Sequence, residues 1–178
     1  MINSSWAKVG ERIKNLINIV GLSLLFTYLL ALIDFILLEI YPFTNFFRKI
    51  LLEQFKFTES KSLTLYHVLL FLAYYIFLYI ALKKLYKSDK RKRLKIFSYV
   101  FIFHFLFGLE DVFYYINYLL LFKTLPDVCF SGMFWLNLSI YGLPFYIMFG
   151  KVTIYNLILT SGLGIVIIST LEYFLNIL

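Results

Sequence analysis

Residues 96–122 (IFSYVFIFHFLFGLEDVFYYINYLLLF) form an almost unbroken apolar run, with two adjacent acids, Glu110 and Asp111, in its middle. A helix of these 27 residues is roughly 40 Å long, which exceeds the hydrocarbon thickness of a bilayer. The two acids are therefore expected near the membrane midplane, where an ionised side chain costs about 2.5–3.5 kcal/mol. Acids at this depth indicate a polar interior within an otherwise apolar bundle.

The composition of the whole chain is that of an integral membrane protein. Of the 178 residues, 62% are hydrophobic and 15% are charged, whereas soluble domains contain about 45–50% apolar and about 25% charged residues. The sequence predicts an all-α, polytopic bundle that forms a single domain, 1–178. We expect about five transmembrane helices, because five apolar runs are long enough to cross a bilayer: about 16–40, 63–82, 96–122, 131–149 and 152–177.

Two segments between the predicted spans carry charge. Residues 44–57 place apolar side chains on one helical face but are too short to cross, so we expect an interfacial helix. Residues 83–95 (KKLYKSDKRKRLK) hold eight of the 17 Lys and Arg residues and predict a basic hairpin. Because cytoplasmic loops are enriched in Lys and Arg, we expect the N-terminus and this hairpin on the cytoplasmic side of the cell membrane. Five spans then place the C-terminus outside.

The basic hairpin has two interpretations. It is a solvated loop that only fixes the topology, or it binds anionic lipid headgroups at about 1 kcal/mol per residue. No fold signature for nucleic-acid recognition accompanies the charge, so no specific nucleic-acid binding is expected. The residues available for lipid contact are Lys83, Lys84, Lys87, Lys90, Arg91, Lys92, Arg93 and Lys95.

The five predicted spans contain five acids but not one Lys or Arg. Acids within a membrane normally face the bundle interior or a wet cavity. Here they are expected to be protonated, hydrogen-bonded to polar neighbours, or matched by a cation from outside. With the orientation above, Asp34, Asn137 and Glu172 each lie roughly 8–10 Å below the outer interface, and Asp111 lies about a turn deeper. The sequence thus predicts a carboxylate-lined pocket in the outer half of the bilayer.

The candidate residues for binding a ligand or carrying a proton share these depths or helical faces. They are Asp34, His104, Glu110, Asp111, Tyr115, Asn137 and Glu172. The competing interpretation is that these side chains only hold the helices together through interhelical hydrogen bonds, which contribute well under about 2 kcal/mol each.

Metal and cofactor chemistry has little support in the sequence. His104 and Asp111 are seven residues apart, about 10 Å along a helix, which is too far for both to bind one metal ion. The single cysteine, Cys129, has no base near it in sequence, and there is no HExxH or glycine-rich phosphate loop. We therefore expect neither a metal nor a cofactor.

Three functions are compatible with these features. The first is a pocket that binds or moves a cation, a proton or a small amphiphile. A carrier of this size would need to form a homo-oligomer or join a membrane complex. The second is a structural or assembly subunit of a membrane complex. The third is a small lipid-modifying enzyme that uses Glu110 or Asp111 as general acid or base. Whether the protein is an enzyme stays open at this stage.

Overall fold

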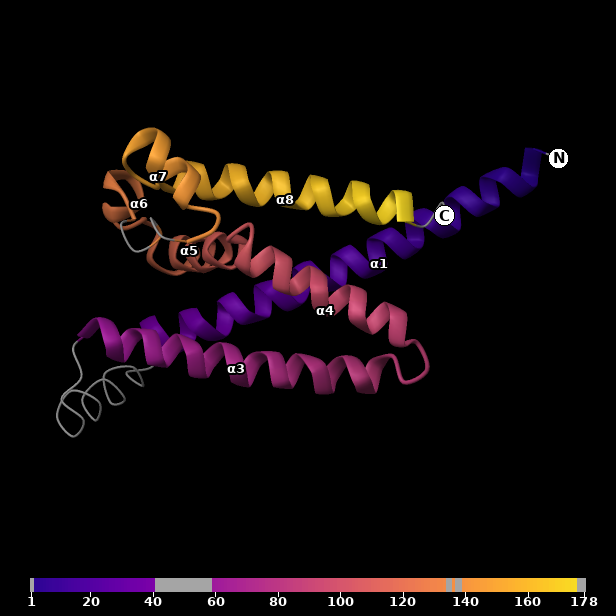
Figure 1. The fold of residues 1–178 in the computed structure, drawn as a ribbon, viewed down its shortest axis with the longest axis horizontal. Helices are drawn as coiled ribbons and strands as arrows, with labels where there is room; N and C mark the ends of the chain where they lie inside the picture. Colours follow the sequence, from indigo (N-terminus) through magenta and orange to yellow (C-terminus); the bar gives the residue numbers. More distant parts are fainter. Residues whose placement is uncertain (1, 41–58, 134–135, 137–138, 176–178) are drawn as a thin grey trace.

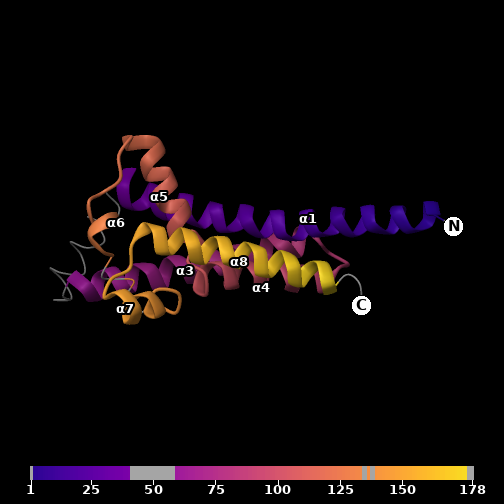
Figure 2. The same cartoon turned by 90° about the horizontal axis from the view of Figure 1, so that it is seen from above.

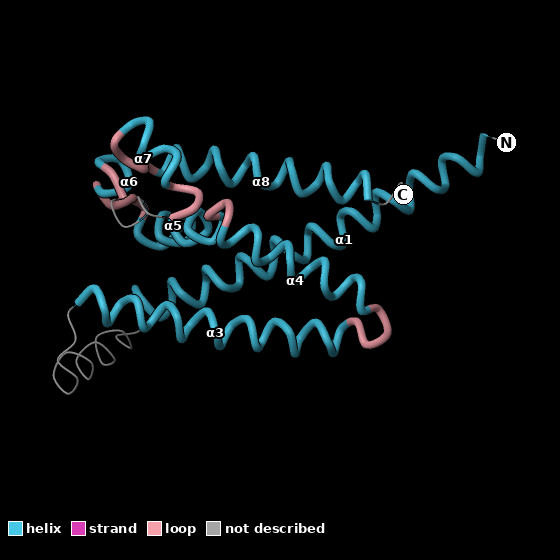
Figure 3. The backbone as a smooth tube through the Cα atoms, in the orientation of Figure 1, coloured by secondary structure: helices cyan, strands magenta, loops and turns pink. Residues whose placement is uncertain are grey.

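The structure, a computed structural model, describes residues 2–40, 59–133, 136 and 139–175, without the side chains of 2–8 and 59–64. Within these residues all regular structure is helical, which confirms the all-α prediction. Figures 1 and 3 show long helices lying side by side, with short helices gathered at one end. The predicted interfacial helix, 44–57, lies outside the described residues.

The longest element is α1, and the other long helices pack around it (Figure 2). It continues into a short π-helix, η1, and it contacts α3, α4, α5 and α8. The bounds are α1 Ile2–Phe35, η1 Ile36–Ile40, α3 Glu59–Leu85, α4 Lys90–Phe105, α5 Leu109–Phe122 and α8 Ile154–Leu175.

An apolar core joins these helices along their facing sides. Leu30 of α1, Leu78 of α3 and Phe103 of α4 are completely buried in it. The outward faces carry large exposed apolar side chains such as Leu72 and Val166. In water such faces would be unfavourable, whereas in a bilayer they contact lipid.

Three helices are long and apolar enough to cross a membrane: Val9–Ile40, Leu65–Leu85 and Ile154–Leu175. A fourth crossing is formed if α4 and α5 are counted as one broken span, since they are bent by 70° at the break. The described residues thus support three or four membrane-spanning helices.

The predicted continuous helix over 96–122 is interrupted at Leu106–Gly108. Gly108 adopts a left-handed conformation with φ of +61°, which glycine reaches without the steric cost of a Cβ. A Cβ at this position would lie 2.6 Å from the Tyr141 ring. The Phe107 carbonyl accepts a hydrogen bond of 2.9 Å from the Ser161 hydroxyl of α8. Such a partner is what permits a broken helix inside a membrane.

The described residues of the predicted span over 131–149 do not form one continuous helix. They form the end of α6 (Val128–Ser131), turns, and α7 (Leu143–Phe149). Seven residues of helix are only about 10 Å long and cannot cross a bilayer. Pro144 lies in the first turn of α7, where its missing N–H is tolerated. Both short helices lie at the end of the bundle where α8 begins (Figure 1).

The ends of the chain therefore lie at the same end of the bundle, together with the hairpin between α3 and α4 (Figure 1). An ion pair of 2.7 Å between Lys95, at the end of the hairpin, and Glu172, near the end of α8, is consistent with this arrangement. The sequence predicted opposite sides for the two termini because it counted 131–149 as a crossing. In the structure α8 instead runs toward the hairpin end of the bundle, as Figure 1 and the contact of Glu172 with Lys95 show.

The close contact of α8 with the break predicts opposite effects for two neighbouring glycines. A Cβ at Gly164 would lie 2.3 Å from the Phe107 ring, whereas one at Gly162 would meet nothing within 4 Å. We expect Gly164→Ala to lower the free energy of unfolding by about 1–3 kcal/mol. Gly162→Ala should leave it unchanged or raise it by up to about 1 kcal/mol. Unfolding in detergent micelles with increasing dodecyl sulfate measures both, and equal effects would contradict the described packing.

Candidate functional site

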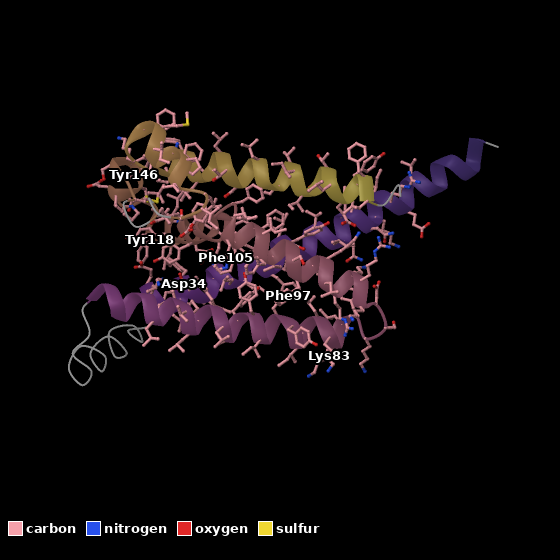
Figure 4. All side chains as sticks on the ribbon, viewed as in Figure 1. Asp34, Lys83, Phe97, Phe105, Tyr118 and Tyr146 are labelled. Atoms are coloured by element: carbon pink, nitrogen blue, oxygen red, sulfur yellow. The ribbon has the colours of Figure 1, made fainter. Side chains whose placement is uncertain are left out.

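A cavity of about 360 Å³ lies where the break between α4 and α5 meets α1, α3 and the segment before α7. Its polar lining consists of Asp34, His67, His104, Glu110, Asp111, Ser139 and Tyr141. Its apolar lining consists of Phe71, Phe105, Leu136 and Ile140. No Lys or Arg lines it among the described residues. Figure 4 shows Asp34 toward the end of the bundle opposite Lys83.

The three carboxyl groups of this cavity differ in their hydrogen-bond partners. Asp34 accepts a hydrogen bond of 3.0 Å from the Tyr66 hydroxyl. Asp111 accepts one from the Tyr141 hydroxyl. Glu110 is 5% exposed, and its Oε1 atom has no hydrogen-bond partner among the described residues. A buried polar atom without a partner costs about 1–3 kcal/mol. Among the three carboxyl groups of the cavity, only Glu110 has such an atom within the described residues.

The broken helix places two helix ends at the cavity. Glu110 and Asp111 lie in the first turn of α5, where the free backbone N–H groups stabilise negative charge by up to about 2 kcal/mol. His104 and Phe105 lie in the last turn of α4, where free carbonyl oxygens carry partial negative charge. The N–H groups at the start of α5 lower the free-energy cost of ionised Glu110 and Asp111 at this depth. The carbonyl oxygens at the end of α4 favour a positively charged ligand.

The histidines belong to an aromatic wall. The His104 ring stacks on Phe105 with centroids 4.1 Å apart and meets the edge of Phe71 at 4.4 Å. Its Nδ1 atom is 3.0 Å from the Tyr75 hydroxyl. His67 packs against Phe71 at 5.8 Å. The cavity therefore combines acidic groups with a flat, mainly apolar surface.

Of the seven predicted site residues, the structure brings four together in this cavity, namely Asp34, His104, Glu110 and Asp111. Tyr115 does not line it and packs instead in a separate apolar cluster with Cys129. Asn137 lies outside the described residues.

Glu172 lies at the other end of the bundle and not in the predicted pocket. Its carboxylate is completely buried, accepts a hydrogen bond of 2.5 Å from the Tyr99 hydroxyl, and pairs with Lys95 at 2.7 Å. The sequence placed it near Asp34 because it assumed the opposite direction for α8. Lys95 is correspondingly engaged with Glu172, which sets it apart from the other cations of the hairpin.

Sequence reasoning missed three residues that shape the cavity. Tyr66 and Tyr141 supply the hydroxyl donors for Asp34 and Asp111, and His67 lines the cavity. Tyr66 and His67 were detectable, since they lie near the outer end of the predicted second span, at about the depth of Asp34. Tyr141 shares a helical face with the candidate Asn137 in the predicted fourth span, but its actual position depends on the turns found in its part of the chain.

The arrangement of acids does not form a metal centre in the part of the chain that the structure describes. No three His, Cys, Asp or Glu side chains come close enough together there to hold a metal ion. The chemistry that the cavity offers is hydrogen-bond acceptance and negative charge beside aromatic rings.

Comparison of the chain with protein-family models, with curated proteins and with solved structures found no match. The functional argument therefore depends on the geometry of the cavity.

The Lys95–Glu172 pair predicts a double-mutant cycle. Lys95→Met removes the cation but leaves Glu172 buried, so we expect the free energy of unfolding to fall by about 2 kcal/mol. The expected loss is smaller than the loss of about 3–5 kcal/mol that is typical when a fully buried ion pair is broken, because the Lys95 side chain is 18% exposed. Adding Glu172→Gln should recover at least half of that loss. Dodecyl sulfate unfolding of the four proteins checks this, and purely additive losses would show that the two groups do not interact.

Proposed function

We propose that this protein crosses the membrane four times and binds a small organic cation, a protonated amine with an apolar body, in the cavity at the α4–α5 break. The observation that carries the proposal is the buried Glu110 oxygen, which has no hydrogen-bond partner among the described residues and belongs to a residue lining that cavity.

The four proposed crossings are α1, α3, the broken pair α4–α5, and α8. By connectivity, eleven of the 17 Lys and Arg residues then lie on the side of the basic hairpin and six on the other side. Because cytoplasmic loops are enriched in Lys and Arg, the hairpin and both termini face the cytoplasm. The acidic cavity then lies in the outer half of the bilayer.

The volume of the cavity suits a small ligand. A water molecule occupies about 30 Å³ in the liquid, so about 360 Å³ corresponds to roughly a dozen non-hydrogen atoms. Phe71, Phe105 and Ile140 provide apolar surface for the body of such a ligand. The aromatic rings add attraction for a cation of about 0.5–2 kcal/mol.

The charge of the lining favours a cation over an anion or a neutral molecule. Three acids and no Lys or Arg line the cavity within the described residues. An ammonium N–H that donates to Glu110 would satisfy the unpartnered oxygen, and a hydrogen bond to a charged group contributes about 1.5–3 kcal/mol. These carboxylates would repel an anion, and the free N–H groups at the start of α5 already face Glu110 and Asp111.

The proposal predicts that Glu110→Gln weakens amine binding by about 10- to 100-fold, which is the loss of one charge-assisted hydrogen bond. The probe is N,N-dimethyl-3-phenylpropylamine, and its uncharged comparison is (4-methylpentyl)benzene, in which CH replaces nitrogen. Calorimetric titration of the protein in lipid nanodiscs measures both affinities. The wild type should bind the amine and discriminate against the hydrocarbon.

Glu39→Gln is the matched control for this experiment. Glu39 accepts a hydrogen bond from Tyr114 at 2.5 Å and does not line the cavity, so its replacement should leave amine affinity within about twofold. If Glu39→Gln and Glu110→Gln weaken the amine equally, or if the hydrocarbon binds as well as the amine, the proposed site is wrong.

The proposed topology predicts the same location for both ends of the chain. A green fluorescent protein fused to either terminus should fluoresce, and alkaline phosphatase fused to either terminus should be inactive, because that enzyme requires export from the cytoplasm. Active phosphatase at the C-terminus alone would instead support five crossings. Fusions within the 83–95 hairpin report the cytoplasmic side independently.

A further inference from the structure

A second cavity, of about 600 Å³, lies at the opposite end of the bundle, beside the basic hairpin. It is bordered by α1, by the beginning of α4 and by the end of α8. Three cations line it together with one acid, one amide and two apolar side chains. These are Arg91, Lys92, Lys95, Asp89, Asn15, Ile19 and Leu175.

Two of the three cations are available to a ligand. Lys95 is paired with Glu172 at 2.7 Å, and Asp89 caps α4 by accepting a hydrogen bond of 2.8 Å from the Lys92 backbone N–H. Arg91 is exposed, and the Lys92 ammonium lies 4.7 Å from the centre of the Tyr86 ring. With Lys95 paired to Glu172, the wall of the cavity carries the positive charges of Arg91 and Lys92 and the negative charge of Asp89, so its net charge is positive.

The cavity also touches the apolar surface of the bundle. Leu175 lines it and is 43% exposed, and Phe174 beside it on α8 is 58% exposed. Ile19, which also lines the cavity, is 6% exposed and belongs to the apolar core. Cations beside exposed apolar surface match an amphiphile that has an anionic head and hydrocarbon chains. A water-soluble anion would use only the cations.

We propose that this cavity binds the headgroup phosphate of an anionic phospholipid, with Arg91 and Lys92 as its partners. The acyl chains of that lipid lie along the exposed apolar surface at Phe174 and Leu175, at the end of α8. This site is independent of the amine cavity at the other end of the bundle. It also differs from general attraction of lipid to the hairpin, because only three of the eight cations of 83–95 line it.

The chain offers a matched control in the same hairpin. Lys83 and Lys84 are exposed and lie on α3, which Figure 1 shows across the bundle from α8, and neither lines the cavity. Arg91→Gln/Lys92→Gln and Lys83→Gln/Lys84→Gln remove the same charge from the same hairpin. Only the first pair removes the proposed ligands.

The test is equilibrium binding of tail-labelled phosphatidylglycerol to the purified protein in neutral detergent micelles. At 0.5 M salt the Debye length is on the order of 4 Å, so diffuse attraction is screened. We expect Arg91→Gln/Lys92→Gln to weaken binding about 30-fold, since each cation contributes about 1 kcal/mol. Lys83→Gln/Lys84→Gln should change it by less than about twofold. Tail-labelled phosphatidylcholine should bind the wild type weakly.

Three outcomes would overturn the proposal. Equal weakening by the two double variants would show diffuse attraction only. Equal affinity for phosphatidylcholine would show that the negative charge is not recognised. Displacement of the labelled lipid by glycerol phosphate at the same concentration as by unlabelled phosphatidylglycerol would identify a site for soluble phosphates. If the Arg91→Gln/Lys92→Gln protein does not fold, the exposed Arg91→Gln alone is compared with Lys83→Gln, and the same expectations apply at about fivefold.

Discussion

In lipid, a backbone polar group cannot be left without a hydrogen-bond partner. The break between α4 and α5 is the point of this structure where that constraint applies. The 70° bend frees backbone groups that a continuous helix would have satisfied. The Phe107 carbonyl finds the Ser161 hydroxyl, and Gly108 allows the Tyr141 ring to approach the turn. The same break puts Glu110 and Asp111 at a helix N-terminus, where negative charge is favoured.

The acids near this break have two interpretations, and the structure separates them residue by residue. Asp34 and Asp111 each accept a tyrosine hydroxyl from another segment, so interhelical hydrogen bonding is sufficient to explain them. Glu110 has a buried oxygen with no partner among the described residues. The interhelical hydrogen bonds of the described residues do not account for that oxygen, and the proposed amine would donate to it.

The acids at the two ends of the bundle differ in whether a Lys or Arg side chain accompanies them. At the hairpin end, Glu172 is matched by Lys95 and Tyr99. At the other end, three acids share a cavity whose described lining holds no Lys or Arg. The sequence treated Glu172 as one of these cavity acids, because composition and spacing do not show in which direction α8 crosses. In the structure the end of α8 lies beside Lys95 at the hairpin end, away from Asp34.

Local properties of the chain were sufficient to predict the helical membrane fold, the basic hairpin, and a common location for Asp34, His104, Glu110 and Asp111. Apolar length, charge and depth along a helix can each be counted within one segment. The bend at Gly108, the direction of α8 and the Lys95–Glu172 pair were decided only by tertiary structure. Each depends on contacts between residues more than fifty positions apart, such as Phe107 with Ser161, and no single segment contains that information.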